Sequence, residues 1–137
     1  GGISPKRSLV RAVITLLLQQ PALGREVEPP FAFADLDLPG IGLMVALLET
    51  LHIRPDISTA LLLEAFEQHA DYPALQKLAL ANMPGDEAIW RQEFRDALAQ
   101  LNRQARQQRL ATLRQLMAQS GLSLQETEEL RDLLKPN

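Results

Sequence analysis

The chain has 137 residues, a formal net charge of −3 and no cysteine. This length accommodates one core, or one domain with a small appendage. The lack of cysteine excludes disulfides, thiolate metal ligands and a cysteine nucleophile, and the negative charge argues against phosphate-backbone binding as the default function. No apolar run approaches the roughly 18 residues of a membrane span, and the start lacks a signal-peptide pattern, so we expect a cytoplasmic protein.

Composition favours an all-α fold. Hydrophobic residues make up 46% of the chain but aromatic residues only 4%, and most of the apolar residues are Leu and Ala, which are the best helix formers. The charges are unevenly spread: residues 31–85 hold two basic residues against seven acids, whereas residues 101–114 carry four arginines and no acid. The middle of the chain is therefore acidic, and the helix that follows it has a basic face.

The first predicted helix is dense in apolar residues. Ser4-Pro5 is typical of a helix start, with Ser as the N-cap and Pro at the first helical position, and Gln20-Pro21 ends the helix. Residues 22–26 can form one further turn, and Glu28-Pro29-Pro30 predicts an extended connector. The apolar density predicts a helix that is buried on most sides.

Three further helices are expected before residue 86. One spans Ile41–His52 after Pro39-Gly40, and the next spans roughly Ser58–His69. The third begins after Asp71, whose side chain can cap it, and ends before Met83-Pro84-Gly85. No strand pattern is present in the sequence.

A long helix is predicted over residues 86–120, which contain no internal Pro or Gly. Its apolar residues lie on one helical face at first and on a rotated face after a polar stretch at 102–109. The first face comprises Trp90, Phe94, Ala97, Leu98, Leu101 and Ala105, and the second comprises Leu110, Leu113, Leu116 and Met117. Two faces imply two packing partners.

A short final helix follows. Gly121 is expected to end the long helix in a left-handed conformation, and Ser123-Leu124-Gln125-Glu126 is typical of a capping box. Leu130, Leu133 and Leu134 can then pack on the second face of the long helix, forming a helical hairpin suited to docking another protein. The alternative is that the long helix bends at its polar stretch and folds back onto the main domain.

The sequence offers few residues that could serve as a nucleophile, a general base or a metal-ligand set. His52 and His69 lie near predicted helix ends, where a structural role is favoured. Acidic pairs such as Glu64/Glu67 and Glu126/Glu129 lack a histidine partner, and Gly40-Ile41-Gly42 lacks the strand and third glycine of a phosphate loop. We expect no catalytic residue, metal site or cofactor.

Two basic features suit binding. Lys6, Arg7 and Arg11 lie beside apolar residues of the first helix, and Lys77 can join them if the fourth helix packs alongside. A basic rim around an apolar notch suits a peptide with acids and a terminal aromatic residue, although solvated surface charges are the simpler alternative. The run Arg103/Arg106/Arg109 lines one side of a helix, and without neighbouring aromatics we expect protein contact rather than base stacking.

In order and spacing, these segments resemble the C-terminal helicase-binding domain of bacterial DNA primase. The resemblance covers nearly the whole chain and is weaker in the C-terminal half. It rests on four apolar segments and on the long helix followed by a short one: the segments are Lys6–Arg11 continuing to Leu17-Leu18-Gln19-Gln20-Pro21, Leu38–Leu43, Leu61–Glu64 and Leu75–Leu78.

The resemblance implies a compact helical bundle over residues 1–100 and a C-terminal hairpin over 101–137, linked by the long helix. It implies that the fragment is not an enzyme, because catalysis belongs to the polymerase domain of the full-length primase. The hairpin would dock on the N-terminal domain of the hexameric replicative helicase, and the bundle would receive the acidic tail of single-stranded-DNA-binding protein. We expect a monomer, and the two apolar faces of the long helix also permit hairpin exchange between chains at high concentration.

Carried onto this sequence, the resemblance assigns two sets of binding residues. The helicase-binding set is Leu113, Leu116, Met117, Leu122, Leu130, Leu133 and Leu134. The acidic-tail set is Lys6, Arg11, Ile14, Lys77 and Leu78. The alternatives are the helicase's own ring-forming N-terminal domain, a domain that binds single-stranded nucleic acid through its basic helix faces, and, more distantly, a small helical hydrolase.

Overall fold

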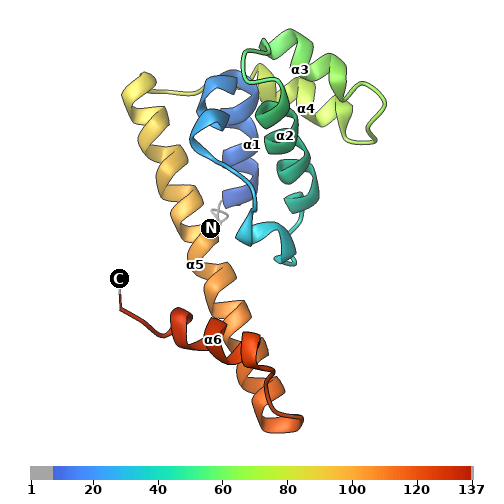
Figure 1. The fold of residues 1–137 in the computed structure, drawn as a ribbon. Coiled ribbons are helices and arrows are strands. Elements are labelled where there is room, and N and C mark those ends of the chain that lie inside the picture. The colour runs from blue at the N-terminus through green and yellow to red at the C-terminus, as the bar shows by residue number, and fades with distance from the viewer. Residues whose placement is uncertain (1–7, 137) are drawn as a thin grey trace, which may run out of the picture.

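The computed structural model describes residues 8–136 and confirms the all-α class, since those residues contain helices and no strand. A bundle of short helices is followed by one long helix that projects from it and by a final helix beside the projecting end (Figure 1). In chain order the helices are α1 (Leu9–Gln19), η1 (Pro21–Glu26), η2 (Ala32–Asp35), α2 (Ile41–Ile53), α3 (Thr59–Ala65), α4 (Tyr72–Ala79), α5 (Glu87–Gln119) and α6 (Leu124–Leu133), of which η1 and η2 are 3₁₀ helices. None of these helices combines the length and the apolar character that a membrane crossing requires.

Helix α1 is the centre of the bundle, and α2, α3, α4, α5 and η1 all pack against it. Its side chains are buried on most sides, as the apolar density predicts; the buried residues are Val10, Val13, Ile14, Leu16, Leu17 and Leu18. The Ser8 hydroxyl accepts a hydrogen bond from the Arg11 backbone N–H at 3.1 Å and caps the helix. The described helix therefore begins at Leu9, and the predicted start at Ser4-Pro5 lies outside the described residues.

The short elements differ from the sequence expectation in three places. Helix α3 ends at Ala65 rather than near His69, because the chain enters a series of tight turns in which the His69 N–H bonds to the Phe66 carbonyl at 2.9 Å. Asp71 precedes α4 but its side chain makes no capping hydrogen bond. Helix η2 was not expected; its Phe33 is buried in the core and the element packs against α5.

Helix α5 is one continuous helix of 33 residues, about 50 Å long at 1.5 Å per residue. Phe94, Ala97, Leu101 and Ala105 enter the bundle core, whereas Leu113 is fully buried outside that core. Because each residue turns a helix by about 100°, Leu113 lies about 120° around the axis from Leu101. Two packing faces are thus confirmed, and the alternative in which the helix bends and folds back is wrong.

A core substitution on α5 tests this arrangement. Leu101 is 0% exposed, so Leu101→Ala leaves a cavity in the bundle, and we expect the free energy of unfolding to fall by about 2–5 kcal/mol. Urea denaturation followed by circular dichroism measures the change. Leu80→Ala is the matched control, because Leu80 is 87% exposed, and its change is expected to stay within about 0.5 kcal/mol. Equal effects of the two substitutions would contradict the packing described here.

Candidate functional site

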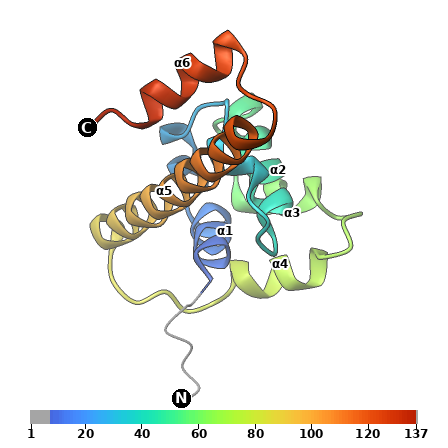
Figure 2. The ribbon, with the colours of Figure 1, turned by 90° about the horizontal axis from the view of Figure 1, so that it is seen from below.

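The hairpin is formed by the outer end of α5 and by α6, which packs extensively on α5 alone among the described elements (Figures 1 and 2). Gly121 makes the turn: its φ is 82°, its N–H bonds to the Leu116 carbonyl at 3.0 Å, and an added Cβ would meet nothing within 4 Å. The glycine is therefore required by the backbone conformation and not by space.

A complete capping box begins α6. The Glu126 N–H donates to the Ser123 hydroxyl at 3.0 Å, and the Ser123 N–H donates to the Glu126 carboxylate at 2.9 Å. The predicted capping box is thus confirmed. Two of the backbone N–H groups left free by the helix start are satisfied in this way.

An apolar seam joins the two helices, and the predicted helicase-binding residues divide over it. Leu113 is fully buried, and Leu116, Leu122, Leu130 and Leu133 are half-buried. Met117 and Leu134 are each 54% exposed. The buried and half-buried members hold the hairpin together, whereas the exposed pair is available to a partner.

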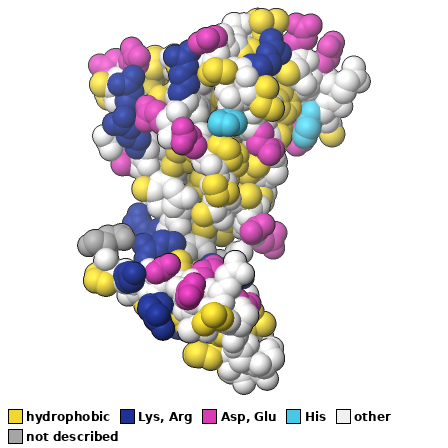
Figure 3. Space-filling view, in the orientation of Figure 1, with side chains coloured by type: hydrophobic (Ala, Val, Ile, Leu, Met, Phe, Trp, Pro, Cys, Tyr) yellow, Lys and Arg dark blue, Asp and Glu magenta, His cyan; other side chains and the backbone are white. Residues whose placement is uncertain are grey.

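Leu124, at the first position of α6, is a further exposed apolar residue of the hairpin that the sequence pattern did not single out. Its side chain is 79% exposed, and hydrophobic side chains reach the surface of the hairpin in the space-filling view (Figure 3). The sequence feature that could have indicated its exposure is its position directly after the capping serine, outside the apolar stripe of α6 that packs on α5. Exposed large apolar side chains grouped on a small element are typical of interaction sites.

Polar contacts across the hairpin come from the arginine run. Arg109 donates two hydrogen bonds to the Glu129 carboxylate, at 2.7 and 2.8 Å. Arg106 donates to the Leu133 carbonyl at 3.0 Å. Two of the three arginines expected to meet another protein are thus engaged within the chain, and Arg103 alone of the run lies exposed without such a contact among the described residues.

These contacts perturb the ionisation of the hairpin. The hydrogen bond from Arg109 lowers the pKa of Glu129, and the same bond raises the pKa of Arg109. Hydrogen bonds from the Ser123 backbone and side chain lower the pKa of Glu126. Both carboxylates therefore stabilise the hairpin in their charged form.

A groove of about 560 Å³ lies between α1 and the segment that joins α4 to α5. Arg11 and Leu78 line it, together with apolar Leu16 and Met83 and the acid Glu93. Gln19 fixes one wall, because its amide nitrogen donates to the Leu78 and Ala81 carbonyls, both at 2.8 Å. Two members of the predicted acidic-tail set therefore meet in one groove.

The other members of that set do not line the groove. Ile14 is buried at 5% exposure, and its Cδ1 would lie 3.7 Å from a Cβ added at Gly40, which places it towards the start of α2. Lys77 is exposed on α4 but is not part of the groove lining. Lys6 lies outside the described residues.

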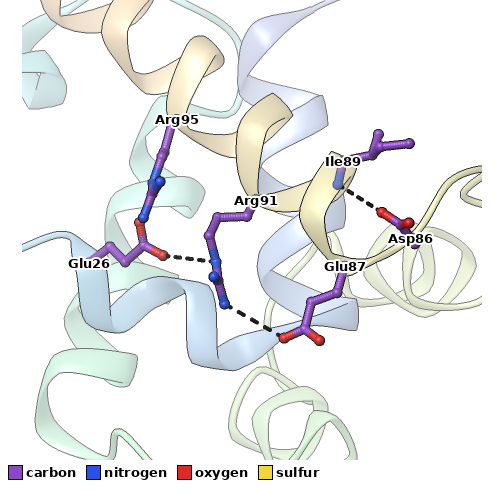
Figure 4. A network of polar contacts seen from close by, with 6 residues as sticks. All are labelled: Glu26, Asp86, Glu87, Ile89, Arg91 and Arg95. Carbon is purple, nitrogen blue, oxygen red and sulfur yellow. Dashed lines mark hydrogen bonds and ion pairs between the residues drawn. The ribbon is translucent and has the colours of Figure 1, made fainter.

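An ionic network fixes the start of α5 on the bundle (Figure 4). Arg95 bonds to Glu26 at 2.8 Å, and Arg91 lies 3.6 Å from both Glu26 and Glu87. Asp86 caps the helix by accepting from the Ile89 N–H at 3.1 Å. These side chains are partly solvated, so each pair contributes little to stability, and the network orients α5 on η1.

Both histidines lie near helix ends among the described residues. His69 Nδ1 accepts the Asp71 N–H at 3.0 Å, and His52 is exposed near the end of α2. Within residues 8–136, no group of three or more His, Asp or Glu side chains is placed to hold a metal ion.

Comparison with known proteins gives matches over most of the chain. A family model described as "DNA primase DnaG DnaB-binding" matches residues 10–133. The DNA primase of Salmonella typhimurium is 34% identical over 125 residues, which are 91% of this chain and 22% of that protein. The Escherichia coli K12 DNA primase is 34% identical over 93 residues, covering 68% of this chain and 16% of that protein.

A solved structure is similar as well. The C-terminal domain of the DnaG primase from Vibrio cholerae superposes with a TM-score of 0.84 at 29% identity, covering 93% of this chain and 96% of that one. By contrast, the chain spans only about a fifth of the length of the curated relatives it matches.

Acid is expected to release α6 before it unfolds the bundle. A carboxyl group whose pKa is lowered by folding stabilises the fold above its ordinary pKa, and this contribution is lost as the pH falls through the lower, folded-state value. Glu126 and Glu129 are both of this kind. Between about pH 5 and pH 3, amide hydrogen exchange, corrected for intrinsic rates, should show α6 losing protection ahead of α1.

Glu129→Gln isolates the Arg109 contribution, because the amide keeps the shape of the side chain and removes its charge. We expect this variant to show lower α6 protection at neutral pH and a weaker dependence on acid. If the α6 and α1 amides lost their protection from exchange together over the whole pH range, early release of α6 in acid would be contradicted.

Proposed function

The chain belongs to the DNA primase DnaG DnaB-binding family, and on this premise we propose that it docks on the replicative helicase DnaB through the α5–α6 hairpin. The observation that supports the hairpin is the exposure of three large apolar side chains: Met117 near the outer end of α5, and Leu124 and Leu134 at the two ends of α6. Removing apolar surface from water is the dominant favourable contribution to most protein–protein association.

In a full-length primase, this docking would bring primer synthesis to the replication fork. The rest of such a protein, about four fifths of its length in the matched relatives, would supply the catalysis. Transient complexes have interfaces of modest area, so a single hairpin needs only modest affinity for the helicase.

Two rival functions receive less support. Family membership favours a primase domain over the helicase's own N-terminal domain. A nucleic-acid-binding role would use the arginine run, yet Arg106 and Arg109 contact α6, which leaves fewer free cations for phosphates.

Truncation tests the docking proposal. The chain and a version ending at Ser120 are titrated calorimetrically into the purified helicase, and circular dichroism checks that the truncated bundle is folded. We expect binding by the chain and none by the truncated version. Unchanged binding after truncation would place the interface on the bundle, and no binding by the intact chain would contradict helicase docking.

Point variants refine the same test. Met117→Ser and Leu134→Ser each remove an exposed apolar contact, so each should weaken helicase binding about tenfold, or about 1.4 kcal/mol, without lowering thermal stability. Leu80→Ser is the control, because it makes the same kind of change at a large apolar residue that is exposed on the bundle.

The groove supports a second binding function. We propose that it receives an acidic peptide with a terminal aromatic residue, such as the tail of single-stranded-DNA-binding protein. Arg11 would pair with the peptide's acids, and Leu16, Leu78 and Met83 offer an apolar floor. Glu93 also lines the groove and would repel the peptide's acids, which would favour their placement at Arg11.

A charge reversal tests the groove. Arg11→Glu should weaken binding of a fluorescent tail peptide about tenfold or more, because it replaces an attraction by a repulsion. Arg114→Glu, which makes the same charge change on an exposed site of α5, should leave affinity within about twofold at 0.15 M salt. Equal effects of the two would indicate general electrostatics and not a groove.

A further inference from the structure

We propose that Arg106 and Arg109 are positioning residues that fix α6 on α5 in the orientation in which the hairpin binds its partner. This inference rests on the proposed helicase docking. It differs from the expectation that these arginines touch the partner themselves.

The apolar seam leaves the position of α6 weakly defined. No side chain of α6 is fully buried, and Leu113 is the one fully buried residue that α5 contributes outside the bundle core. Contacts between leucines are not directional, so a short helix can slide or rotate along such a seam at little cost. Directional contacts are needed to select one arrangement.

Arg109 and Arg106 provide two such contacts. They are one turn apart on α5, and their partners Glu129 and Leu133 are one turn apart on α6. The order is antiparallel, since the lower-numbered arginine meets the higher-numbered partner. Two fixed points of this kind set both the register and the rotation of α6.

Each contact uses a property of the arginine side chain. The planar guanidinium of Arg109 bonds both Glu129 oxygens, at 2.7 and 2.8 Å, which constrains direction as well as distance. Arg106 satisfies a carbonyl of the last turn of α6 and places a positive charge at the negative end of that helix.

The Arg109–Glu129 ion pair is exposed to solvent, so its effect on the free energy of unfolding should be small. The side chains of Arg109 and Glu129 are 42% and 39% exposed, and exposed ion pairs contribute little to folding. Docking is more sensitive, because Met117 on α5 and Leu124 and Leu134 on α6 can meet one surface together only if the two helices keep a fixed relation.

A charge-swap cycle tests the inference. The variants are R109E, E129R and the double variant R109E/E129R, with R114E and E128R as controls that make the same charge changes on exposed neighbouring sites of α5 and α6. Helicase affinity is measured by calorimetry, and α6 amide exchange is measured on the same samples without helicase. Because the swap restores the pair, the cycle separates an internal contact from a contact to the partner.

We expect each single variant to bind the helicase about fivefold more weakly and to exchange its α6 amides faster. The double variant should return to within about twofold of the unmodified chain in both readings, and each control should stay within twofold. R106M should speed exchange in the last turn of α6 only.

A double variant that binds more weakly than either single one would overturn the inference, because it would mean that the arginine contacts the helicase directly. Single variants with unchanged α6 exchange would overturn it as well. If the unmodified chain does not bind the helicase, the proposed function fails, and the exchange cycle alone decides whether the pair orders α6.

Discussion

The rotation of the apolar face along α5 is the constraint on which the rest of the structure depends. Leu101 belongs to the bundle core and Leu113 to the hairpin, and an unbroken helix holds them about 120° apart around its axis. Between them, Gln108 donates to the Asp35 carbonyl of η2 at 3.1 Å, at the edge of the bundle. Because α5 cannot turn both faces to one core, it must leave the bundle and take α6 as a second partner.

The two ends of α5 differ in how completely the side chains packed against them are buried. At the bundle end, α1 is enclosed by neighbours and the core side chains are fully removed from water. At the hairpin end, α6 has no fully buried side chain and is ordered by its capping box, by Gly121 and by arginine contacts. Because the bundle has a core of its own, the hairpin attached to it can keep large apolar side chains exposed.

The arginine run shows why charge in a sequence is ambiguous. Four basic residues without a nearby acid in the chain indicate a basic surface, yet Glu129, twenty residues further on, returns to Arg109 across the turn. The groove is also formed by residues that the sequence pattern alone does not bring together. Arg11 and Leu78 both line it although they are 67 positions apart in the chain, whereas Ile14, one turn from Arg11, faces Gly40 instead.

The sequence by itself determined what depends on neighbouring residues: the all-α class, the extent of α5, the turn at Gly121 and the capping box at Ser123. These follow from periodicity, backbone conformation and hydrogen bonds within a few residues of each other. Only the tertiary structure decided that η2 packs against α5, and which leucines of the hairpin are buried and which exposed. Those features depend on contacts between segments far apart in the chain, and a local pattern specifies that a face is apolar without specifying what covers it.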